Sequence, residues 1–408
     1  MPNVVFVAPF VLEATRRFVH AAAALPGTRL VLVTQEPAER LSESLRADLG
    51  GHYKVDNALD AQQIVDAVRS IAKRVGPVAR VIGMLEQLQV PLAEARAALG
   101  LPGLAPDAAR GFRDKSVMKD RLRQSGIPCA RHCLAATAAM ATQFAREQGF
   151  PLVVKPPAGA GAKSTFRVDN LEQLSKAIEL YRPAPGREML LEEFLVGEEH
   201  SFDCVFVRGR PVWFSLSRYL PSPLEVLETP WIQWCVLLPR HVDGPEYAAI
   251  REVGPRAIAT LGLETGVAHM EWFRRPNGTV AISEVGARPP GAQFCSLISY
   301  AHDVDFYRAW AQLAVYESFD PPTRRWSVGG AYFRGQGAGR VTAVEGVEQA
   351  QRELGSLVVE ARLPRVGQGR NDSYEGEGYA ILRHPETAVV ERALRRIVEV
   401  VQVKVANS

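Results

Sequence analysis

The sequence predicts a parallel α/β unit followed by mixed α+β units. Strand-like and helix-like runs alternate over roughly the first hundred residues, which is typical of βαβ units and a doubly wound parallel sheet. From residue 113 to about residue 316 the pattern changes to hairpins and helices, and the rest of the chain holds short strands and two helices. With 408 residues, 47% of them apolar, the chain is long enough for two or three domains.

The N-terminal unit is expected to span residues 1–112. Its strand-like runs are "VVFVAP", "RLVLVT" and "ARVIGML", and its helix-like runs are "ATRRFVHAAAAL" and "AQQIVDAVRSIAKRV". The first strand-to-helix turn, "APFVLEA", has no glycine cradle for a phosphate, which favours a substrate or structural domain over a nucleotide site. The stretch "LGLPGLAPDAARGFRDK", rich in Gly, Pro and Ala, marks the end of this unit.

A helix and a glycine-rich loop open the second unit, residues 113–316. Asp114 is a helix cap for "KSVMKDRLRQSG". The stretch "VVKPPAGAGAKSTFRV" has nearly the spacing of a phosphate-binding P-loop, but Pro157 and Ala162 stand where that motif needs glycines. A helical pattern begins only after Asp169-Asn170, so this region is predicted as strand, glycine loop, strand.

Charge and composition exclude several classes of function. The formal net charge is +3 and no basic run of the kind that follows a nucleic-acid backbone is present, so we expect no nucleic-acid partner. No apolar stretch approaches the roughly 20 residues that span a bilayer, and the N-terminus lacks a basic signal region, so we expect no membrane partner and a cytoplasmic location. Five cysteines without a CxxC pair fit reduced thiols better than disulfides or a zinc site.

The most informative stretch is "HMEWFRRPNGTVAISEVGARPPG", residues 269–291. Asn-Gly between alternating apolar residues is a strong hairpin signal, and a two-residue turn at Asn277-Gly278 would place Glu271 directly opposite Glu284. Facing carboxylates destabilise a hairpin unless a positive charge lies between them. The spacing therefore predicts a site for a hard divalent cation, Mg²⁺ or Mn²⁺, with Arg288 on the same face to meet a phosphoryl group.

A second interpretation of this hairpin stays open. Both glutamates could simply face water on a surface hairpin. Pro276 also indicates that the turn could be longer than two residues, because proline has no N–H for the closing hydrogen bond.

Taken together, these residues resemble the ATP-grasp superfamily over residues 113–316, by their order and spacing rather than by one decisive motif. The resemblance implies an ATP-grasp fold in which ATP lies between two α+β subdomains, one of them a small lid at about residues 125–193, while residues 317–408 complete the catalytic domain. Lys115 and Lys155 match the two lysines that contact the α- and β-phosphates. The glycine loop matches the lid over the phosphates, with contacts from Gly159, Gly161, Ser164 and Thr165.

The resemblance also implies where the rest of ATP would bind. The strand formed by Glu192, Glu193, Phe194 and Leu195 matches the hinge that reads the adenine edge, through main-chain groups of Glu193 and Leu195. Glu199 then falls where the family places its acceptor for the ribose hydroxyl groups.

At the metal hairpin the resemblance is close but incomplete. Glu271 and Glu284 match the two metal carboxylates, and Arg288 matches the arginine that touches the transferring phosphate. Gly286 stands where many members of the family have an asparagine that supplies a third ligand, so the number of metal ions stays open.

The activity implied by the resemblance is phosphorylation of a carboxylate by ATP, followed by attack of an amine on the acyl phosphate and release of ADP and phosphate. The chain is most similar to the amino-acid ligases that make dipeptides or dipeptide-like products, and the family implies a homodimer. Two alternatives stay open. One is a carboxylase or purine-biosynthetic enzyme that activates bicarbonate or formate, and the other is a non-catalytic ATP-binding module.

Three residues are candidates for contact with the substrate. Arg218 lies between the hinge and the metal hairpin, where relatives line the substrate pocket, and a guanidinium can hold a carboxylate as a bidentate fork. Gly291, in "PPG", lies where backbone amides could stabilise an oxyanion. His269 is either a supporting residue of the metal site or a structural histidine.

Overall fold

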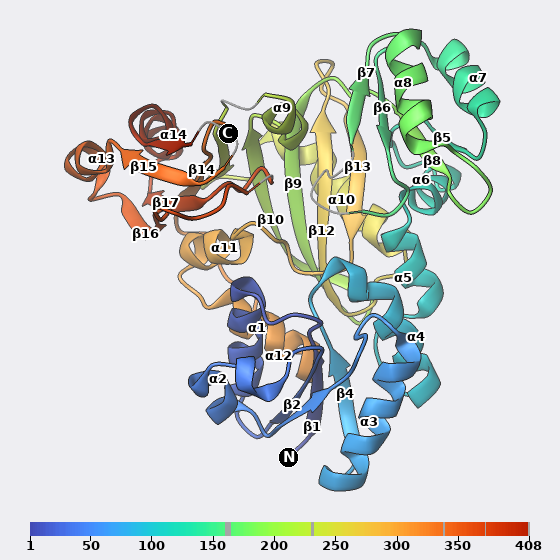
Figure 1. Ribbon diagram of the computed structural model, residues 1–408, viewed down its shortest axis with the longest axis vertical. Helices are drawn as coiled ribbons and strands as arrows, with labels where there is room; N and C mark the ends of the chain where they lie inside the picture. The colour runs from blue at the N-terminus through green and yellow to red at the C-terminus, as the bar shows by residue number, and fades with distance from the viewer. Residues whose placement is uncertain (160–164, 230–231, 338, 372, 407–408) are drawn as a thin grey trace.

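The computed structural model describes residues 1–159, 165–229, 232–337, 339–371 and 373–406. The N-terminal part contains a four-stranded sheet in the order β3-β2-β1-β4 with every pair parallel, which confirms the predicted parallel unit (Figure 1). α2 and β3 carry too few apolar residues to be predicted from a pattern. The elements of this unit are β1 (Asn3–Val7), α1 (Glu13–Ala23), β2 (Arg29–Thr34), α2 (Glu43–Asp48), β3 (Gly51–Lys54), α3 (Ala61–Val75), β4 (Val78–Ile82) and α4 (Gln89–Leu99).

Two helices, α5 (Pro106–Arg113) and α6 (Lys115–Gln124), lead out of the N-terminal unit. Asp114 lies between them and caps α6 as predicted, because its carboxylate accepts hydrogen bonds from the N–H groups of Ser116 at 2.8 Å and Val117 at 3.1 Å. The cap begins the helix at Lys115, which brings Lys115 and Lys119, one helical turn apart, to the same buried side.

A small antiparallel sheet follows, in the order β5-β8-β6-β7, with α7 and α8 packed on one face (Figure 1). β6 pairs with β7 across the glycine loop, which confirms the predicted strand, loop, strand order. Side chains alternate along β6 and β8, so Lys155 and Glu192 lie on the face away from the two helices. The elements are β5 (His132–Ala135), α7 (Ala138–Gln148), β6 (Leu152–Lys155), β7 (Phe166–Val168), α8 (Leu171–Tyr181) and β8 (Met189–Glu193).

The largest element of the fold is an eight-stranded antiparallel sheet in the order β13-β12-β9-β10-β11-β14-β17-β16. Strands from beyond residue 317 therefore extend the sheet that carries the predicted metal hairpin. Its strands are β9 (Glu198–Val207), β10 (Arg210–Leu220), β11 (Trp234–Leu238), β12 (Gly266–Arg274), β13 (Val280–Gly286), β14 (Ser327–Phe333), β16 (Val358–Arg362) and β17 (Gly378–His384). The accompanying elements are α9 (Pro223–Glu228), α10 (Ala248–Thr260), α11 (Phe294–His302), α12 (Phe306–Tyr316), α13 (Val347–Leu354), α14 (Thr387–Val400) and a two-stranded sheet of β15 (Val341–Glu345) and β18 (Gln402–Val405).

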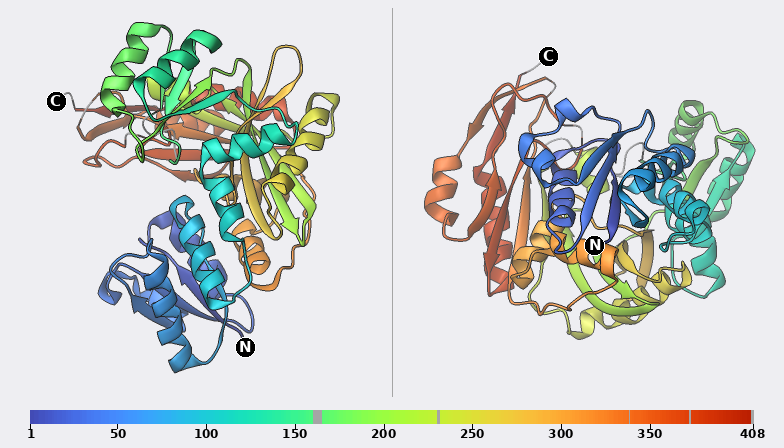
Figure 2. Two further views of the ribbon diagram at one scale, coloured as in Figure 1. Left: turned by 90° about the vertical axis from the view of Figure 1, so that its right-hand side faces the viewer. Right: turned by 90° about the horizontal axis from the view of Figure 1, so that it is seen from below.

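The N-terminal unit and the large sheet share one hydrophobic core. α12 packs against α1, where the rings of Phe18 and Trp310 lie 5.0 Å apart, and the same cluster of buried side chains extends to Tyr332 on β14. The N-terminal unit forms one end of the molecule, and the lobe with α7 and α8 forms the other (Figures 1 and 2). Within the described residues, no helix is long and apolar enough to cross a bilayer.

Candidate active site

β12 and β13 form the predicted hairpin, and Glu271 lies directly opposite Glu284. The turn differs from the prediction, because the N–H of Arg275 donates to Thr279 O at 2.8 Å and closes a loop of three residues. Pro276, which has no N–H, opens this loop, and Gly278 adopts the left-handed conformation (φ 81°) that such loops need. A bulge between Glu271 and Trp272 then shifts the register back, so the two carboxylates still meet.

The face of the sheet that carries these glutamates is polar across four strands. Glu284 pairs with Glu271, Glu271 with Ser201, and Ser201 with Ser217, whose hydroxyl lies 2.7 Å from that of Ser201. One step along β12, His269 Nδ1 lies 2.7 Å from Asp203 Oδ1. A row of buried polar side chains on a sheet face is costly unless it is paired or binds a ligand, so the surroundings of each group decide what the row can do.

Three buried lysines gather beside this row. Lys115 Nζ lies 2.9 Å from Glu284 Oε1, while Lys119 Nζ and Lys155 Nζ lie 2.9 Å from the two oxygens of Glu192. Lys119 also donates to the carbonyl of Ser283 at 2.6 Å, at the bulge in β13. Each of the three lysines is at most 8% exposed, so together they form a dry cluster of positive charge at the sheet face.

Burial and pairing compete in this cluster. Burial opposes ionisation of Glu192, but Lys119 and Lys155 outweigh it and hold the pKa of this carboxyl below its usual value. Burial likewise opposes ionisation of Glu284, yet the charges of Lys115 and Lys155 lower its pKa to about 2. For Lys119 burial wins, so its pKa is lowered. Both carboxylates are therefore ionised at neutral pH, and the lysines are held in place by charge-assisted hydrogen bonds.

The opposite carboxylate has a different environment. Burial raises the pKa of Glu271, and the facing Glu284 raises it further. Burial also raises the pKa of Glu199 well above its usual value, with Glu271 adding to the effect. The hydroxyl of Tyr219 approaches Glu271 Oε1 at 3.5 Å, and no lysine or arginine lies within 4 Å of Glu271 in the described part of the chain. On this side of the site the two carboxyl groups therefore have no lysine or arginine partner within 4 Å among the described residues.

Arg288 joins this site to the N-terminal unit. Its Nε donates to Glu86 Oε2 at 2.6 Å, and Glu86 also lies 3.7 Å from Arg113. Burial lowers the pKa of Arg288, but the Glu86 carboxylate outweighs this effect and raises the pKa overall, so the guanidinium stays charged. A Cβ on Gly286 would lie 3.1 Å from Glu86 Oε2, so the missing side chain at this position makes room for the Glu86–Arg288 pair.

Gly159, the last described residue before the gap in the glycine loop, lies beside the lysine cluster. The carbonyl of Gly159 accepts hydrogen bonds from Arg113 at 3.0 Å and from Lys115 at 3.2 Å. Thr165 is partly exposed at the start of β7, and Gly161 and Ser164 lie outside the described residues.

One main-chain group of the predicted hinge already has a partner. The N–H of Glu193 donates to Arg131 O at 2.9 Å and is therefore not free for a base, whereas the Leu195 N–H makes no backbone hydrogen bond within the described ranges. The carboxylate of Glu193 pairs with Arg275 at 2.7 Å, and Arg167 stacks on the ring of Phe194 at 4.6 Å.

Of the predicted substrate residues, Arg218 lies away from the site, whereas Gly291 lies near Arg288. Arg218 is not brought to the site, because it is paired with His200 next to Ser217 on β10, and alternation turns it to the opposite face from Glu271. Gly291 lies in the loop after Arg288, with open space where a Cβ would be. The prediction of Arg218 as a substrate residue is therefore corrected by the register of β9 and β10.

Lys119 and Glu86 are functional candidates that the sequence analysis missed. Lys119 follows Lys115 by one helical turn on a capped helix, and this spacing was a usable signal. Glu86 had no such signal, since it contacts Arg288 across 202 residues of sequence.

Two carboxylates, Glu271 and Glu284, suit a hard divalent cation that also binds phosphate oxygens and water. The fit rests on Glu271, a half-buried residue whose carboxyl group has no lysine or arginine within 4 Å among the described residues and has a raised pKa. The described residues contain no group of three or more His, Cys, Asp or Glu side chains arranged around a common point for a metal. These residues therefore fit a cation shared with a phosphorylated ligand better than a cation held by the protein alone.

Comparison with known proteins identifies the domain. Residues 120–299 match the model of the ATP-grasp domain. The chain carries an ATP-grasp domain. This match and the structural similarities below confirm the predicted resemblance and fold.

The ATP-grasp relatives include amino-acid ligases. The chain is 24% identical over 272 residues, 65% of its length, to an L-arginine-specific L-amino acid ligase from Bacillus subtilis, and the match spans 64% of that relative. Its structure is similar over the whole chain to an L-amino acid ligase from Bacillus licheniformis, with a TM-score of 0.80, 19% identity and 99% of that chain covered. It also resembles N5-carboxyaminoimidazole ribonucleotide synthetase from Thermotoga maritima over 100% of both chains, with a TM-score of 0.73 and 17% identity.

Proposed function

We propose that the protein is an ATP-dependent carboxylate–amine ligase that joins two L-amino acids or similar small molecules and releases ADP and phosphate. One observation carries the proposal. Three buried lysines with two paired carboxylates lie beside Glu271, a carboxylate that lacks a cation, on one face of an ATP-grasp domain. Phosphoryl transfer asks a protein mainly for positioning and for positive charge around the phosphate oxygens, and this arrangement supplies both.

In the first step a carboxylate oxygen of the substrate attacks the γ-phosphorus of ATP, and ADP leaves. Lys115 and Lys155 bind the α- and β-phosphates, and Glu192 orients Lys155 and Lys119 through its two oxygens at 2.9 Å. Glu271 and Glu284 would hold Mg²⁺ or Mn²⁺, which neutralises the phosphate charge when bound. Binding of the phosphates frees Glu284 from Lys115, because the lysine then has a stronger anionic partner.

In the second step an amine attacks the acyl carbon of the acyl phosphate, and phosphate leaves. Arg288 donates to the oxygen that becomes negative, with Glu86 fixing the guanidinium at 2.6 Å. The loop that follows, with Gly291, supplies backbone N–H groups near the same oxygen. Leu195 and Glu199 are the proposed contacts to adenine and ribose.

The test is ADP and phosphate release from ATP with Mg²⁺ across pairs of L-amino acids, with bicarbonate plus an amine and with no acceptor as controls. Hydroxylamine in a parallel reaction converts an acyl phosphate to a hydroxamate and reports the first step alone. Release with particular amino-acid pairs supports the ligase. Release with bicarbonate moves the protein to the reaction class of carboxylases and of purine-biosynthetic enzymes such as the Thermotoga relative, and ATP binding without turnover would make it a nucleotide-binding module.

A further inference from the structure

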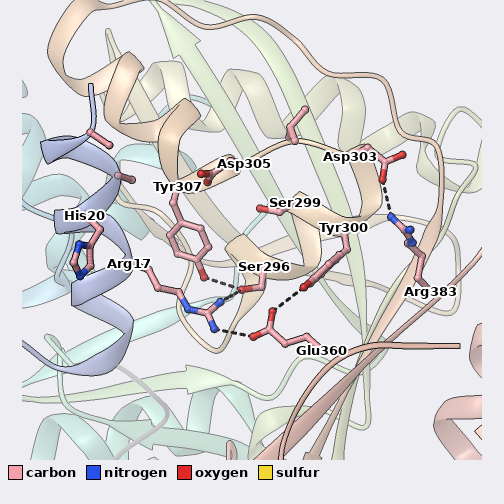
Figure 3. Close-up of a pocket in the computed structure, with 13 residues that line it drawn as sticks. Arg17, His20, Ser296, Ser299, Tyr300, Asp303, Asp305, Tyr307, Glu360 and Arg383 are labelled. Atoms are coloured by element: carbon pink, nitrogen blue, oxygen red, sulfur yellow. Dashed lines mark hydrogen bonds and ion pairs between the residues drawn. The ribbon is translucent and has the colours of Figure 1, made fainter. Parts of the chain in front are cut away.

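Two cavities outside the candidate active site differ in how their charges are paired. The larger, about 840 Å³, lies between α1, α11 and β16. Figure 3 shows a network across its floor, in which Arg17 joins Ser296 to Glu360 and Arg383 pairs with Asp303. The ion pairs measure 2.7 Å and 2.6 Å. Because Arg17 and Arg383 both have carboxylate partners, this lining does not favour a charged ligand.

The second cavity, about 600 Å³, lies where β10 begins, between the segment after β11 and the segment before β14. Two arginines line it, Arg240 and Arg324. Neither has a carboxylate within 4 Å among the residues that the structure describes. Asp243 is the one acidic residue among the described residues that line it, so the lining carries a surplus of positive charge.

Arg324 is held in the cavity wall by neutral acceptors. It donates hydrogen bonds to the carbonyl oxygens of Leu216 and Pro239 and to the hydroxyl of Ser215. A guanidinium has five N–H groups, so two of them have no acceptor in the described part of the chain. Burial lowers the pKa of Arg324 to about 10, which is the sign of a cation without a close anion.

The guanidinium of Arg240 makes fewer hydrogen bonds than that of Arg324. Its guanidinium makes one long contact, from Nη1 to Pro385 O at 3.5 Å, so most of its N–H groups are available to a ligand. Trp213 and Phe214 both line the same cavity, and alternation along β10 turns their side chains to opposite faces of the sheet. Phe214 is the less buried of the two, and the indole N–H of Trp213 is occupied by Pro322 O at 3.0 Å. The cavity thus combines two guanidinium groups that have no carboxylate within 4 Å in the described part of the chain with the apolar ring of Phe214.

We propose that this cavity binds a small organic anion, a carboxylate or a phosphate monoester, whose charge pairs with Arg240 and Arg324 while its apolar part packs on Phe214. Guanidinium groups suit both anions because they form two parallel hydrogen bonds to them. The cavity lies away from the facing glutamates, although Ser215, which accepts a hydrogen bond from Arg324, is paired with Asp203 on the polar face of the sheet. Phe214 and Tyr219, whose hydroxyl approaches Glu271, lie about 16 Å apart along β10 at roughly 3.3 Å per residue.

The experiment is calorimetric titration of the full-length protein, with its nucleotide site saturated by ADP and Mg²⁺. The probes are phenylacetate, an aromatic carboxylate, and phenyl phosphate, its phosphate counterpart. Saturable binding of either probe to one site supports the proposal, and the tighter probe identifies the class of anion. Absence of saturable binding of both would overturn it.

Three variants locate the binding. Arg240→Gln is expected to weaken the probe at least about tenfold, the loss of one charge-assisted pair, without harming the fold, because Arg240 makes a single long contact. Arg324→Lys keeps a cation but removes the planar fork and is expected to weaken binding as well. Arg256→Gln, an exposed arginine paired with Glu252 at 3.7 Å, is the matched control and should bind as the wild type does. Equal affinity of Arg240→Gln and Arg256→Gln would show that the probe binds elsewhere and refute the site.

Discussion

Glu284 and Glu271 face each other across one hairpin, yet their surroundings drive their pKa values in opposite directions. Glu284 lies on the lysine side of the cleft, where Lys115 and Lys155 lower its pKa to about 2 despite burial. Glu271 lies on the carboxylate side with Glu199, where burial raises the pKa and like charge adds to the rise. The lysine side is complete before any ligand binds, whereas the carboxylate side needs a cation. We infer that the cleft is organised in advance for polyphosphate and depends on a divalent cation to balance it.

The strongest test of this contrast is Glu284→Gln. The change removes a proposed metal ligand and leaves Lys115 without its partner at 2.9 Å, so ADP release is expected to fall at least about 10³-fold while the protein stays folded. Steady-state ADP release and circular dichroism measure the two effects. Glu172→Gln, at an exposed glutamate that pairs with Lys176, is the control. Near-normal turnover by folded Glu284→Gln would refute the metal assignment.

Lys155→Met tests the lysine side. Glu192 would keep only Lys119 as partner, and a buried carboxylate that loses one of two cations is expected to cost about 3 kcal/mol of unfolding free energy. ATP turnover should fall by roughly 10²-fold, since one proposed phosphate contact is lost. Urea unfolding and ADP release measure the two effects, with Lys176→Met as a surface control. If Lys155→Met were as stable and as active as Lys176→Met, the lysine cluster would have no role in the proposed mechanism.

Glu86→Gln tests the link from the N-terminal unit to Arg288. The amide keeps a hydrogen-bond acceptor but removes the charge that fixes the guanidinium at 2.6 Å. We expect kcat for ligation to fall about tenfold to a hundredfold, with little change in ADP binding, because Glu86 does not reach the lysine side. Glu94→Gln, at a half-exposed glutamate paired with Arg110, serves as control. Loss of nucleotide binding together with kcat would mean that Glu86 supports the fold rather than Arg288.

The smallest expected effect is on stability at the carboxylate side. Folding raises the pKa of Glu271 above the usual value of about 4.3, so the folded state holds this proton more tightly than the unfolded chain. Stability contributed by that proton is present at low pH and is lost as the pH rises through the raised pKa. Without divalent cations the wild type should therefore lose stability across this range, and Glu271→Gln should not.

Urea unfolding from pH 4 to pH 8 measures this loss. Mg²⁺ should restore the stability of the wild type at high pH and stabilise Glu271→Gln much less, since the variant keeps only Glu284 of the two carboxylates that bind the cation. Parallel curves for both proteins without Mg²⁺ would mean that Glu271 is not destabilised by ionisation.

Local patterns in the sequence predicted a large part of the site. The cap at Asp114, the strands around the glycine loop and the facing of Glu271 and Glu284 all follow from neighbours in sequence, and all are confirmed. The two glutamates do face each other, but the predicted two-residue turn is not the reason. A three-residue loop and a compensating bulge cancel, so period-two alternation led to the correct pair through an incorrect turn.

Other parts depended on contacts that no local pattern encodes. The direction of Arg218 depended on which face of β10 meets the active site, and this followed only from its pairing with β9. The partner of Arg288, Glu86, begins a short 3-10 helix of the N-terminal unit. In the second cavity, Arg240 follows β11 and Arg324 precedes β14.

The sequence by itself determined the order of elements, the helix caps, the hairpin and the types of residue that can bind phosphate and metal, because these depend on dihedral preferences and spacing within a few residues. Only the tertiary structure decided which charges are paired and which are left alone. Burial and Coulomb interaction act through space between distant segments, so the opposite behaviour of Glu284 and Glu271 became visible only in the folded structure, where Lys115 pairs with Glu284 at 2.9 Å and no lysine or arginine of the described residues lies within 4 Å of Glu271.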